Sequence, residues 1–359
     1  MQTSFQLGII DPALRKIRFS PDAAAVLSVA ASAPSRGPDT PFAHWNDRTE
    51  RMLMTDLLLQ QLLNWIVLGS IYALIAVGFS LLFGVLNIIH FSHGDVSFVA
   101  PFVALGAVQA VAASFPVTGG SAGLLLLCLL LALLLTGLLG VVLEILVIRR
   151  FRDAPVMMAL VATVALGIVL RELIRHLFPN GSNPHSFPRF VGGEFVVGGV
   201  TVSWFSMVAV ACAIVAVAAL FALLNKTRLG LHIRAVSQDR DAARLMSISP
   251  TRIFRFTFFI ASAIGAVGAL FFAGYANLVR FDFSVEVGLI GFSAAVVGGL
   301  GSMAGAIVGS LLIAGLDTFV QAVVPNGASY RLVFVFMLVI AVLVFKPSGI
   351  FGRTVVEKV

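Results

Sequence analysis

The sequence predicts an all-α fold, a polytopic membrane helix bundle with about eight or nine transmembrane segments. Of the 359 residues, 59% are hydrophobic and only 11% are charged, whereas about a quarter of the residues of a soluble domain are charged. The mean hydropathy is +1.02, and apolar runs follow one another from Asp56 onward. We therefore expect an integral, multi-pass membrane protein, and the composition excludes a soluble enzyme.

Residues 1–53 differ from the rest of the chain. They contain five prolines, charges of both signs and no sustained apolar run. Two interpretations remain open: a disordered tail, or a start codon assigned too early, because Met52 and Met54 stand directly before the first apolar segment. Residues 54–359 are expected to form one transmembrane domain.

The apolar segments are delimited by the length that a bilayer requires, about 20 residues. The first is long enough to be tilted or broken. The seventh is short and rich in glycine, which allows a re-entrant segment or half a span. The segments are 57–86, 96–115, 122–147, 156–177, 203–224, 256–276, 287–299, 303–323 and 331–345.

The distribution of basic residues predicts the orientation. Arginines cluster at 149–152, and the stretch 226–255 holds seven basic and two acidic residues, which is five of the net charge of +7. Short basic loops lie on the cytoplasmic side, so both loops and the C-terminus are expected inside. The loop 178–202 and, if nine segments cross, the N-terminus are then outside.

Several other classes of site are disfavoured by the sequence. The basic loop lacks aromatic interleaving, so we expect it to reflect topology and not nucleic-acid binding. Cys128 and Cys212 lie inside apolar runs and indicate neither a disulfide nor a metal site. No phosphate-binding loop of the G-x-x-x-x-G-K-[ST] type occurs. The repeats Gly301/Gly305/Gly309 and 261/265/269 predict close helix packing.

Polar residues inside the apolar region are candidates for a transport pathway. The segment between the first two spans carries Asn87, Ser92, His93 and Asp95 without any lysine or arginine. A broken helix that lines a polar cavity would explain this cluster, although a surface turn would also do so. Asp317 lies in the middle of another apolar run, where a carboxylate usually faces the bundle interior and needs a polar partner. Gln321 follows one turn later on the same face.

Other charged residues have a simpler interpretation. Arg171 and its neighbours Glu172, Arg175 and His176 are expected to anchor the outer end of the fourth segment, with Glu172 pairing locally to Arg175 and His176. Glu144 is expected to snorkel to the cytoplasmic interface.

The basic loop contains a predicted short helix from Ser237 to about Ser249. Ser237 is expected to cap it, Asp239 and Asp241 fall in its first turn, and Pro250 prevents its continuation. One semi-apolar face consists of Ala242, Leu245, Met246 and Ser249. Such a helix could rest on anionic lipid or dock in a groove on a cytoplasmic partner.

Several separated stretches resemble one family in the same order. These stretches are 68–76, 87–95, 230–249, 252–270, 298–302 and 347–359. They are similar to the branched-chain amino-acid ABC transporter permeases, the membrane subunits called LivH and LivM, and more closely to LivH. The likeness covers about residues 54–359, with Asp95 where the family commonly has Glu.

The resemblance implies an inner-membrane permease subunit of a bacterial ABC importer for branched-chain or related amino acids. It implies no enzymatic activity and no cofactor or metal on this chain, with ATP used by partners. Those partners would be two cytoplasmic ABC ATPases, a second, LivM-like permease and a periplasmic substrate-binding protein, in a lipid bilayer and without nucleic acid. The ATPase-coupling loop would comprise Arg234, Asp239, Arg240, Asp241, Arg244, Leu245 and Met246, with Arg240 and Arg244 in contact with the ATPase and the last two residues as apolar anchors.

Other functions remain open. Related permeases carry urea or short amides. A stand-alone secondary transporter would instead couple to ions through Asp95 or Asp317, and an internal repeat would favour it; a non-transporting scaffold would leave the polar cluster unexplained.

Overall fold

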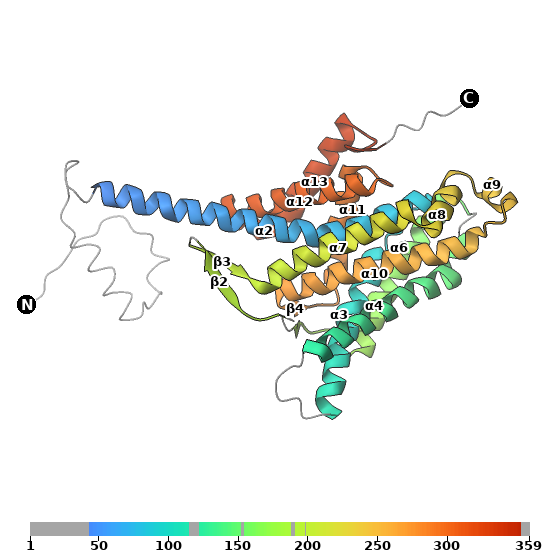
Figure 1. Ribbon diagram of the computed structural model, residues 1–359, viewed down its shortest axis with the longest axis horizontal. Helices are drawn as coiled ribbons and strands as arrows, with labels where there is room; N and C mark the ends of the chain where they lie inside the picture. The colour runs from blue at the N-terminus through green and yellow to red at the C-terminus, as the bar shows by residue number, and fades with distance from the viewer. Residues whose placement is uncertain (1–42, 115–121, 152–153, 188–190, 198, 353–359) are drawn as a thin grey trace, which may run out of the picture. The chain divides into compact units, whose positions relative to one another are not determined.

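The structure is a computed structural model that describes residues 43–114, 122–151, 154–187, 191–197 and 199–352. These residues form helices joined by short connections, with two small two-stranded sheets (Figure 1). Seven of the described helices are long and apolar enough to cross a membrane, and α11 is a shorter apolar helix. The predicted class, a polytopic all-α membrane bundle, is confirmed. Of the predicted tail, residues 1–42 lie outside the described residues, and the stretch from Ala43 belongs to the first helix.

The elements follow the order of the apolar runs. The main helices are α2 (Ala43–Leu86), α3 (His93–Ser114), α4 (Ala122–Leu143), α6 (Val156–Leu177), α7 (Trp204–Lys226), α10 (Pro250–Ala276), the shorter α11 (Phe283–Gly298), α12 (Met303–Val323) and α13 (Gly327–Phe345). The short helices are η2 (Glu144–Ile148), α5 (Arg149–Phe151), α8 (Arg228–Gln238) and α9 (Arg240–Leu245). The strands are β1 (His185–Ser186), β2 (Glu194–Val197), β3 (Val200–Ser203) and β4 (Leu278–Val279).

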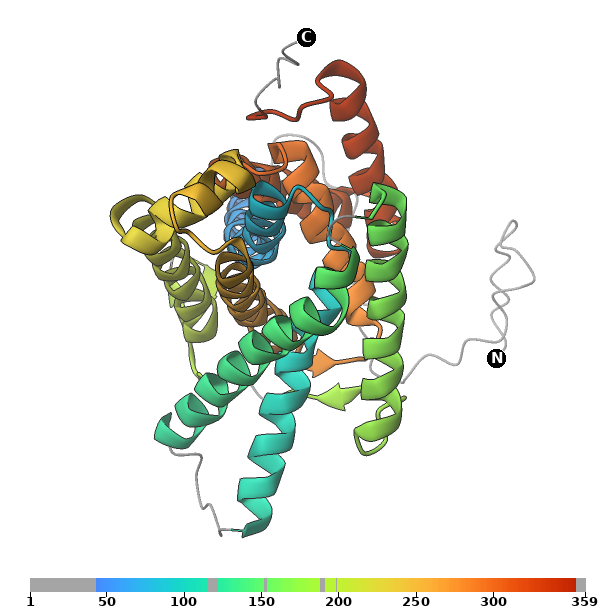
Figure 2. The same cartoon turned by 90° about the vertical axis from the view of Figure 1, so that its right-hand side faces the viewer.

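The chain divides into two units, Met1–Thr55 and Asp56–Val359, and the second contains the bundle. In this unit α2 is the central helix, with its neighbours arranged around it (Figure 2). In the most apolar 18-residue window of α2, 83% of the residues are buried, against 6% in α13. Both helices are strongly apolar, so α2 supplies the core whereas the apolar side chains of α13 are available to lipid or to a partner.

Glycines let α11 and α12 approach each other closely, as the sequence predicts. A Cβ atom at Gly298 would lie 2.0 Å from the Gly305 carbonyl oxygen, and one at Gly309 would lie 2.1 Å from that of Ala294. Gly301 differs from these two, because it precedes α12 and its φ of +84° belongs to the turn between the two helices. The predicted close packing is therefore confirmed for two of the three glycines in the repeat.

The second small-residue repeat lies on α10, where it faces α2 and α3. Ala261 and Ala269 are fully buried, and a Cβ atom at Gly265 would lie 2.1 Å from the Ser97 hydroxyl oxygen on α3. These contacts confirm the packing role that the spacing predicts.

Contacts between loops show which segments share an end of the bundle, and this grouping agrees with the one that the charge pattern predicts. At one end β1 pairs with β4, which brings the loops after α6 and α10 together. At the other end Arg240 bonds to the Leu86 carbonyl, and the backbone N–H of Ile350 bonds to the Val297 carbonyl. The basic loop, the end of α2 and the chain after α13 therefore share the end that faces the viewer in Figure 2.

Candidate functional site

The basic loop forms two short helices, α8 and α9, between α7 and α10 (Figure 1). Asp239 separates them, because its carboxylate accepts hydrogen bonds from the backbone N–H groups of Ala242 (2.9 Å) and Asp241 (2.8 Å). These bonds favour the ionised carboxylate and lower the pKa of Asp239. The prediction that Ser237 caps this helix is wrong: its hydroxyl donates to the Arg234 carbonyl within α8, and α9 begins after Asp239.

The end of α9 presents apolar side chains to the exterior. Leu245 is 87% exposed and Met246 is 76% exposed, whereas Ala243 on the opposite face is 3% exposed and packs into the bundle. Ala242 and Ser249 are exposed as well. The whole face that the sequence marks as semi-apolar therefore points away from the bundle.

The arginines of α9 divide between the exterior and the bundle. Arg244 forms an exposed pair with Asp241 at 3.0 Å. The guanidinium of Arg240 instead donates to the Leu86 carbonyl at 2.6 Å and lies over the Phe254 ring at 5.4 Å. Arg240, for which the resemblance implies contact with an ATPase, is thus already bonded to the end of α2.

Two further basic residues tie the loop to the bundle. Arg234 donates to the Leu224 carbonyl and to Asn225 Oδ1 (3.2 Å) at the end of α7. Arg255, at the start of α10, pairs with Glu144 at 3.7 Å. Because Glu144 is fully buried in this pair, the prediction that it snorkels to the interface is wrong. The guanidinium of Arg255 on α10 supplies the opposite charge.

The polar segment between α2 and α3 is a break in the helix, as one interpretation of the sequence predicts. Asn87 ends α2 in the left-handed conformation (φ 57°) and is exposed. Ser92 and His93 are fully buried at the start of α3. The Ser92 hydroxyl lies 3.4 Å from His90 Nε2, and the His93 ring packs edge-on against Phe79 with 4.7 Å between the ring centroids. Asn87 is therefore separate from the buried polar cluster.

Asp95, in the first turn of α3, contacts two helices that are distant in sequence. Its Oδ1 accepts a hydrogen bond from the Ser284 hydroxyl on α11 at 2.6 Å and one from Arg171 Nη1 on α6 at 3.2 Å. Asp95 is 6% exposed and is therefore shielded from bulk solvent, whereas the side chain of Arg171 is 22% exposed. A carboxylate, a guanidinium and a hydroxyl thus meet between three helices.

Arg171 is a site residue for which the sequence predicts only interfacial anchoring. Its neighbours behave as predicted: Glu172 pairs with Arg175 at 3.5 Å and with His176 at 3.4 Å on the outer surface of α6. Arg171 points to Asp95 instead. No local pattern distinguishes it from Arg175, because only the rotation of α6 against α3 decides which arginine faces inward.

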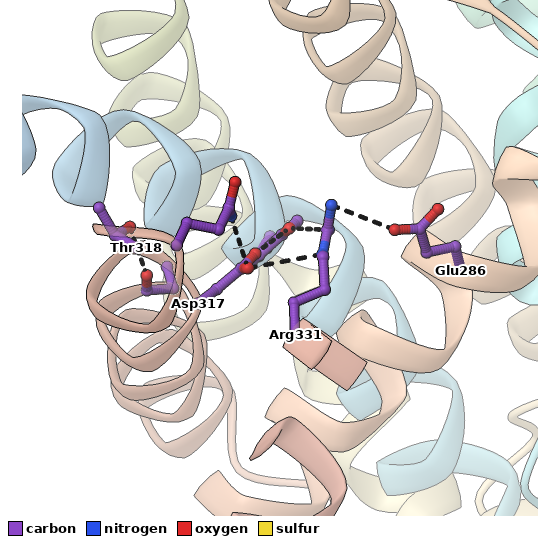
Figure 3. Close-up of polar contacts among 7 residues, drawn as sticks. Glu286, Asp317, Thr318 and Arg331 are labelled. Carbon is purple, nitrogen blue, oxygen red and sulfur yellow. Dashed lines mark hydrogen bonds and ion pairs between the residues drawn. The ribbon is translucent and has the colours of Figure 1, made fainter. Parts of the chain in front are cut away.

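Asp317 is the centre of a second charged cluster (Figure 3). Its carboxylate accepts hydrogen bonds from the Tyr72 hydroxyl (3.0 Å) and from Gln321 (2.8 Å), and it lies 3.5 Å from Arg331. Arg331 also contacts Glu286 at 3.1 Å. The prediction that Asp317 faces the interior with Gln321 on the same face is confirmed; its other partners were not predicted.

These two clusters share helix α11. Ser284 contacts Asp95, and Glu286, two residues later, contacts Arg331 on α13. Residues two positions apart point to different sides of a helix, so α11 has one cluster on each side. Any movement of α11 would therefore act on both charged groups.

The chemistry of these sites is charge pairing and hydrogen bonding. Within the described residues, no three His, Cys, Asp or Glu side chains gather in a way that could hold a metal ion. The described residues thus include the Asp95 and Asp317 clusters, the buried Glu144 that pairs with Arg255, and an exposed apolar tip at the basic end.

Comparison with known proteins finds one protein family that this chain resembles along most of its length. The family model for "Branched-chain amino acid transport system / permease component" matches residues 61–343. The high-affinity branched-chain amino acid transport system permease protein BraD of Pseudomonas aeruginosa is 30% identical over 310 residues, 84% of this chain and 98% of BraD. Its counterpart LivH of Escherichia coli K12 is 29% identical over 308 residues, 84% and 97% of the two chains. A probable branched-chain amino acid permease, LivH of Methanocaldococcus jannaschii, is 23% identical over 84% of this chain and 95% of its own.

Proposed function

Because the chain belongs to the family of branched-chain amino acid transport system permease components, we propose that it carries branched-chain amino acids into the cytoplasm. The chain is a non-catalytic permease of an ABC importer and a multi-pass protein of the inner membrane. The observation that supports the proposed cargo is the match of the family model to residues 61–343. The relatives BraD and LivH, which are named as branched-chain amino acid permeases, align with 84% of this chain.

The energy for transport comes from ATP on partner chains. As an ABC permease, the chain works with ATPase subunits and a substrate-binding protein. The finer composition is part of the proposal: two ATPases, a second, LivM-like permease and no cofactor on this chain.

Helix α9 is the part that we assign to the ATPase contact. Its exposed Leu245 and Met246 supply apolar anchors, and an apolar helix face recognises a groove on a partner. Arg244 and Asp241 provide charge at the rim. Arg240 transmits movement of α9 inward, because it holds the carbonyl of Leu86 at the break between α2 and α3.

One experiment tests both the class and the cargo. A tagged copy is purified from its native membrane in mild detergent, and the associated proteins are identified by mass spectrometry. In parallel, membrane vesicles loaded with ATP are assayed for uptake of radiolabelled leucine with the binding protein supplied. Copurified ATPase and ATP-dependent leucine uptake support the proposal. Uptake that an ionophore abolishes without any need for ATP would instead identify ion-coupled transport, and ATP-dependent uptake of urea but not leucine would overturn the cargo.

A further inference from the structure

A cavity of about 240 Å³ lies beside the Asp95–Arg171 pair. Asp95, Arg171 and Ser284 supply its polar wall, and they come from α3, α6 and α11. The volume is just below the roughly 300–1,000 Å³ that is typical of small-molecule sites. The cavity is therefore of a size that suits a small metabolite.

The remaining wall of the cavity is apolar and rich in aromatic rings. Phe79 comes from α2, Phe91 from the break before α3 and Phe292 from α11. The ring centroids of Phe91 and Phe292 are 5.0 Å apart, and those of Phe79 and Phe292 are 5.8 Å apart. A few convergent polar groups against an apolar wall are the usual composition of a small-molecule site.

The polar wall offers one full charge of each sign. Asp95 is a carboxylate, and Arg171 is a guanidinium whose planar fork carries five N–H donors and can bind a carboxylate through two hydrogen bonds. Its bond to Asp95 uses Nη1. The first turns of α3 and α11 both reach this cavity, and the positive ends of their helix dipoles favour a negative group there.

We propose that this cavity binds the cargo in transit as a zwitterion, an inference that rests on the proposed function. The α-ammonium group of the amino acid contacts Asp95, and its α-carboxylate contacts Arg171 and the Ser284 hydroxyl. Its branched side chain lies against Phe79, Phe91 and Phe292.

Charge balance favours this occupant over a neutral or singly charged one. In the structure Asp95 and Arg171 neutralise each other at 3.2 Å. A zwitterion inserted between them gives the buried carboxylate and the partly buried guanidinium each a new partner of opposite sign and adds no net charge. A buried charge without a partner is strongly unfavourable, so an amine or a carboxylic acid alone leaves one protein charge unpaired. Urea has neither charge, so it offers the pair hydrogen bonds but no partner of opposite charge.

The test compares three ligands of nearly equal shape on the intact, detergent-purified transporter. Leucine has both charges, leucinamide lacks the carboxylate, and 4-methylpentanoate lacks the ammonium group. Titration calorimetry gives Kd for each. We expect Asp95→Asn to weaken leucine at least tenfold without weakening 4-methylpentanoate, which has no ammonium group and no longer leaves a carboxylate unpaired. Arg171→Gln should weaken leucine at least tenfold without weakening leucinamide, which has no carboxylate.

Arg175→Gln is the matched control. Arg175 is an arginine one turn further along α6, and it pairs with the exposed Glu172 outside the cavity. We expect it to leave all three Kd values unchanged. If Arg171→Gln fails to accumulate, Arg171→Lys replaces it; it keeps the charge and loses the planar fork, and it should still weaken leucine severalfold without changing leucinamide.

The outcomes separate this inference from the function on which it rests. Wild-type leucine uptake with a leucine Kd that neither variant changes, or equal losses for all three ligands, overturns the zwitterion site and leaves the permease function standing. Absence of leucine uptake by the wild-type transporter, with its partners present, overturns the proposed cargo itself.

Discussion

Asp317 illustrates how this chain stabilises a charge inside the membrane. Its side chain is buried, Tyr72 on α2 and Arg331 on α13 approach it, and Gln321 lies one turn later on its own helix α12 (Figure 3). A buried charge is tolerated when partners of opposite sign and hydrogen-bond donors compensate for lost hydration. The cluster therefore also fixes the positions of α2, α12 and α13 relative to one another.

Removal of one partner from this cluster should destabilise the protein. In Asp317→Leu the remaining carboxylate partner of Arg331 is Glu286, whose side chain is about one-third exposed. We expect a loss of about 3 kcal/mol, since breaking a buried pair typically costs about 3–5 kcal/mol. The double variant Asp317→Leu/Arg331→Met should recover most of it, because neither charge remains buried. Thermal unfolding in detergent measures both.

The exposed pair between Arg280 and Asp282 is the control for that measurement. Asp282→Asn should change stability by about 1 kcal/mol or less, since solvent screens exposed pairs. If the double variant were no more stable than Asp317→Leu, unpaired charge would not be the cause of the loss.

Asp239 shows how a single cap determines where a helix begins. Its pKa is lowered by the two backbone N–H groups that donate to its carboxylate. A lowered pKa in the folded state means that the stabilisation is present above the unfolded pKa, about 3.9, and is lost as the pH falls through the folded value. The cap therefore operates throughout the physiological range.

The cap leads to a prediction for hydrogen exchange. Asp239→Ala should speed amide exchange in α9 severalfold at pH 7, because two N–H groups lose their acceptor. Asp239→Asn, whose amide oxygen can still accept, should keep most of the protection. Exchange followed by mass spectrometry over 240–246 measures this, and equal exchange in wild type and Asp239→Ala would show that the cap is unimportant.

At the scale of elements, α9 is held to the bundle on one face and exposed on the other. Arg240 and Ala243 fix it inward, whereas Leu245 and Met246 point outward. A helix of six residues is too short to be stable alone. Its position therefore depends on its attachment, which suits an element that passes movement from a partner to α2 and α10.

The exposed tip of α9 should be essential for energy coupling. Leu245→Asp/Met246→Asp is expected to abolish ATP-dependent uptake and retention of the ATPase during purification, because charges replace the apolar anchors. Membrane insertion should be normal, since neither side chain packs into the bundle. Quantitative pull-down and uptake at matched protein levels measure the effect.

A second double substitution controls for charge on an exposed apolar pair. Val196 and Val197 are 68% and 60% exposed on β2, at the opposite end of the chain. Val196→Asp/Val197→Asp should retain the ATPase fully. Normal ATPase retention by the α9 variant would contradict the coupling role.

At the scale of the whole molecule, the two ends of the bundle differ in charge and construction. The basic end carries α8, α9 and the turn before α12, and the other end carries the strands (Figure 1). The positive-inside rule places the basic end in the cytoplasm.

Cysteine labelling tests this orientation. In a variant without Cys128 and Cys212, Ser247→Cys on the basic end should react with a membrane-impermeant maleimide only after the inner membrane is opened. Gly192→Cys, at a position where a Cβ atom meets no other atom within 4 Å, should react from the periplasm in cells with a permeable outer membrane. The reverse pattern would invert the topology.

Local sequence was enough to predict the class, the order of the apolar helices, the family and the exposed face of α9, and it also gives the orientation that the labelling experiment tests. Hydropathy, charge bias and turn residues are local properties, and the membrane makes them decisive because it requires long apolar helices. The start of α9 was mispredicted because Ser237 and Asp239 are equally good caps in sequence. Tertiary packing alone selected Arg171 and not Arg175 for Asp95, and Arg331 for Asp317. Those choices depend on how each helix is rotated and packed against distant segments, which no local pattern encodes.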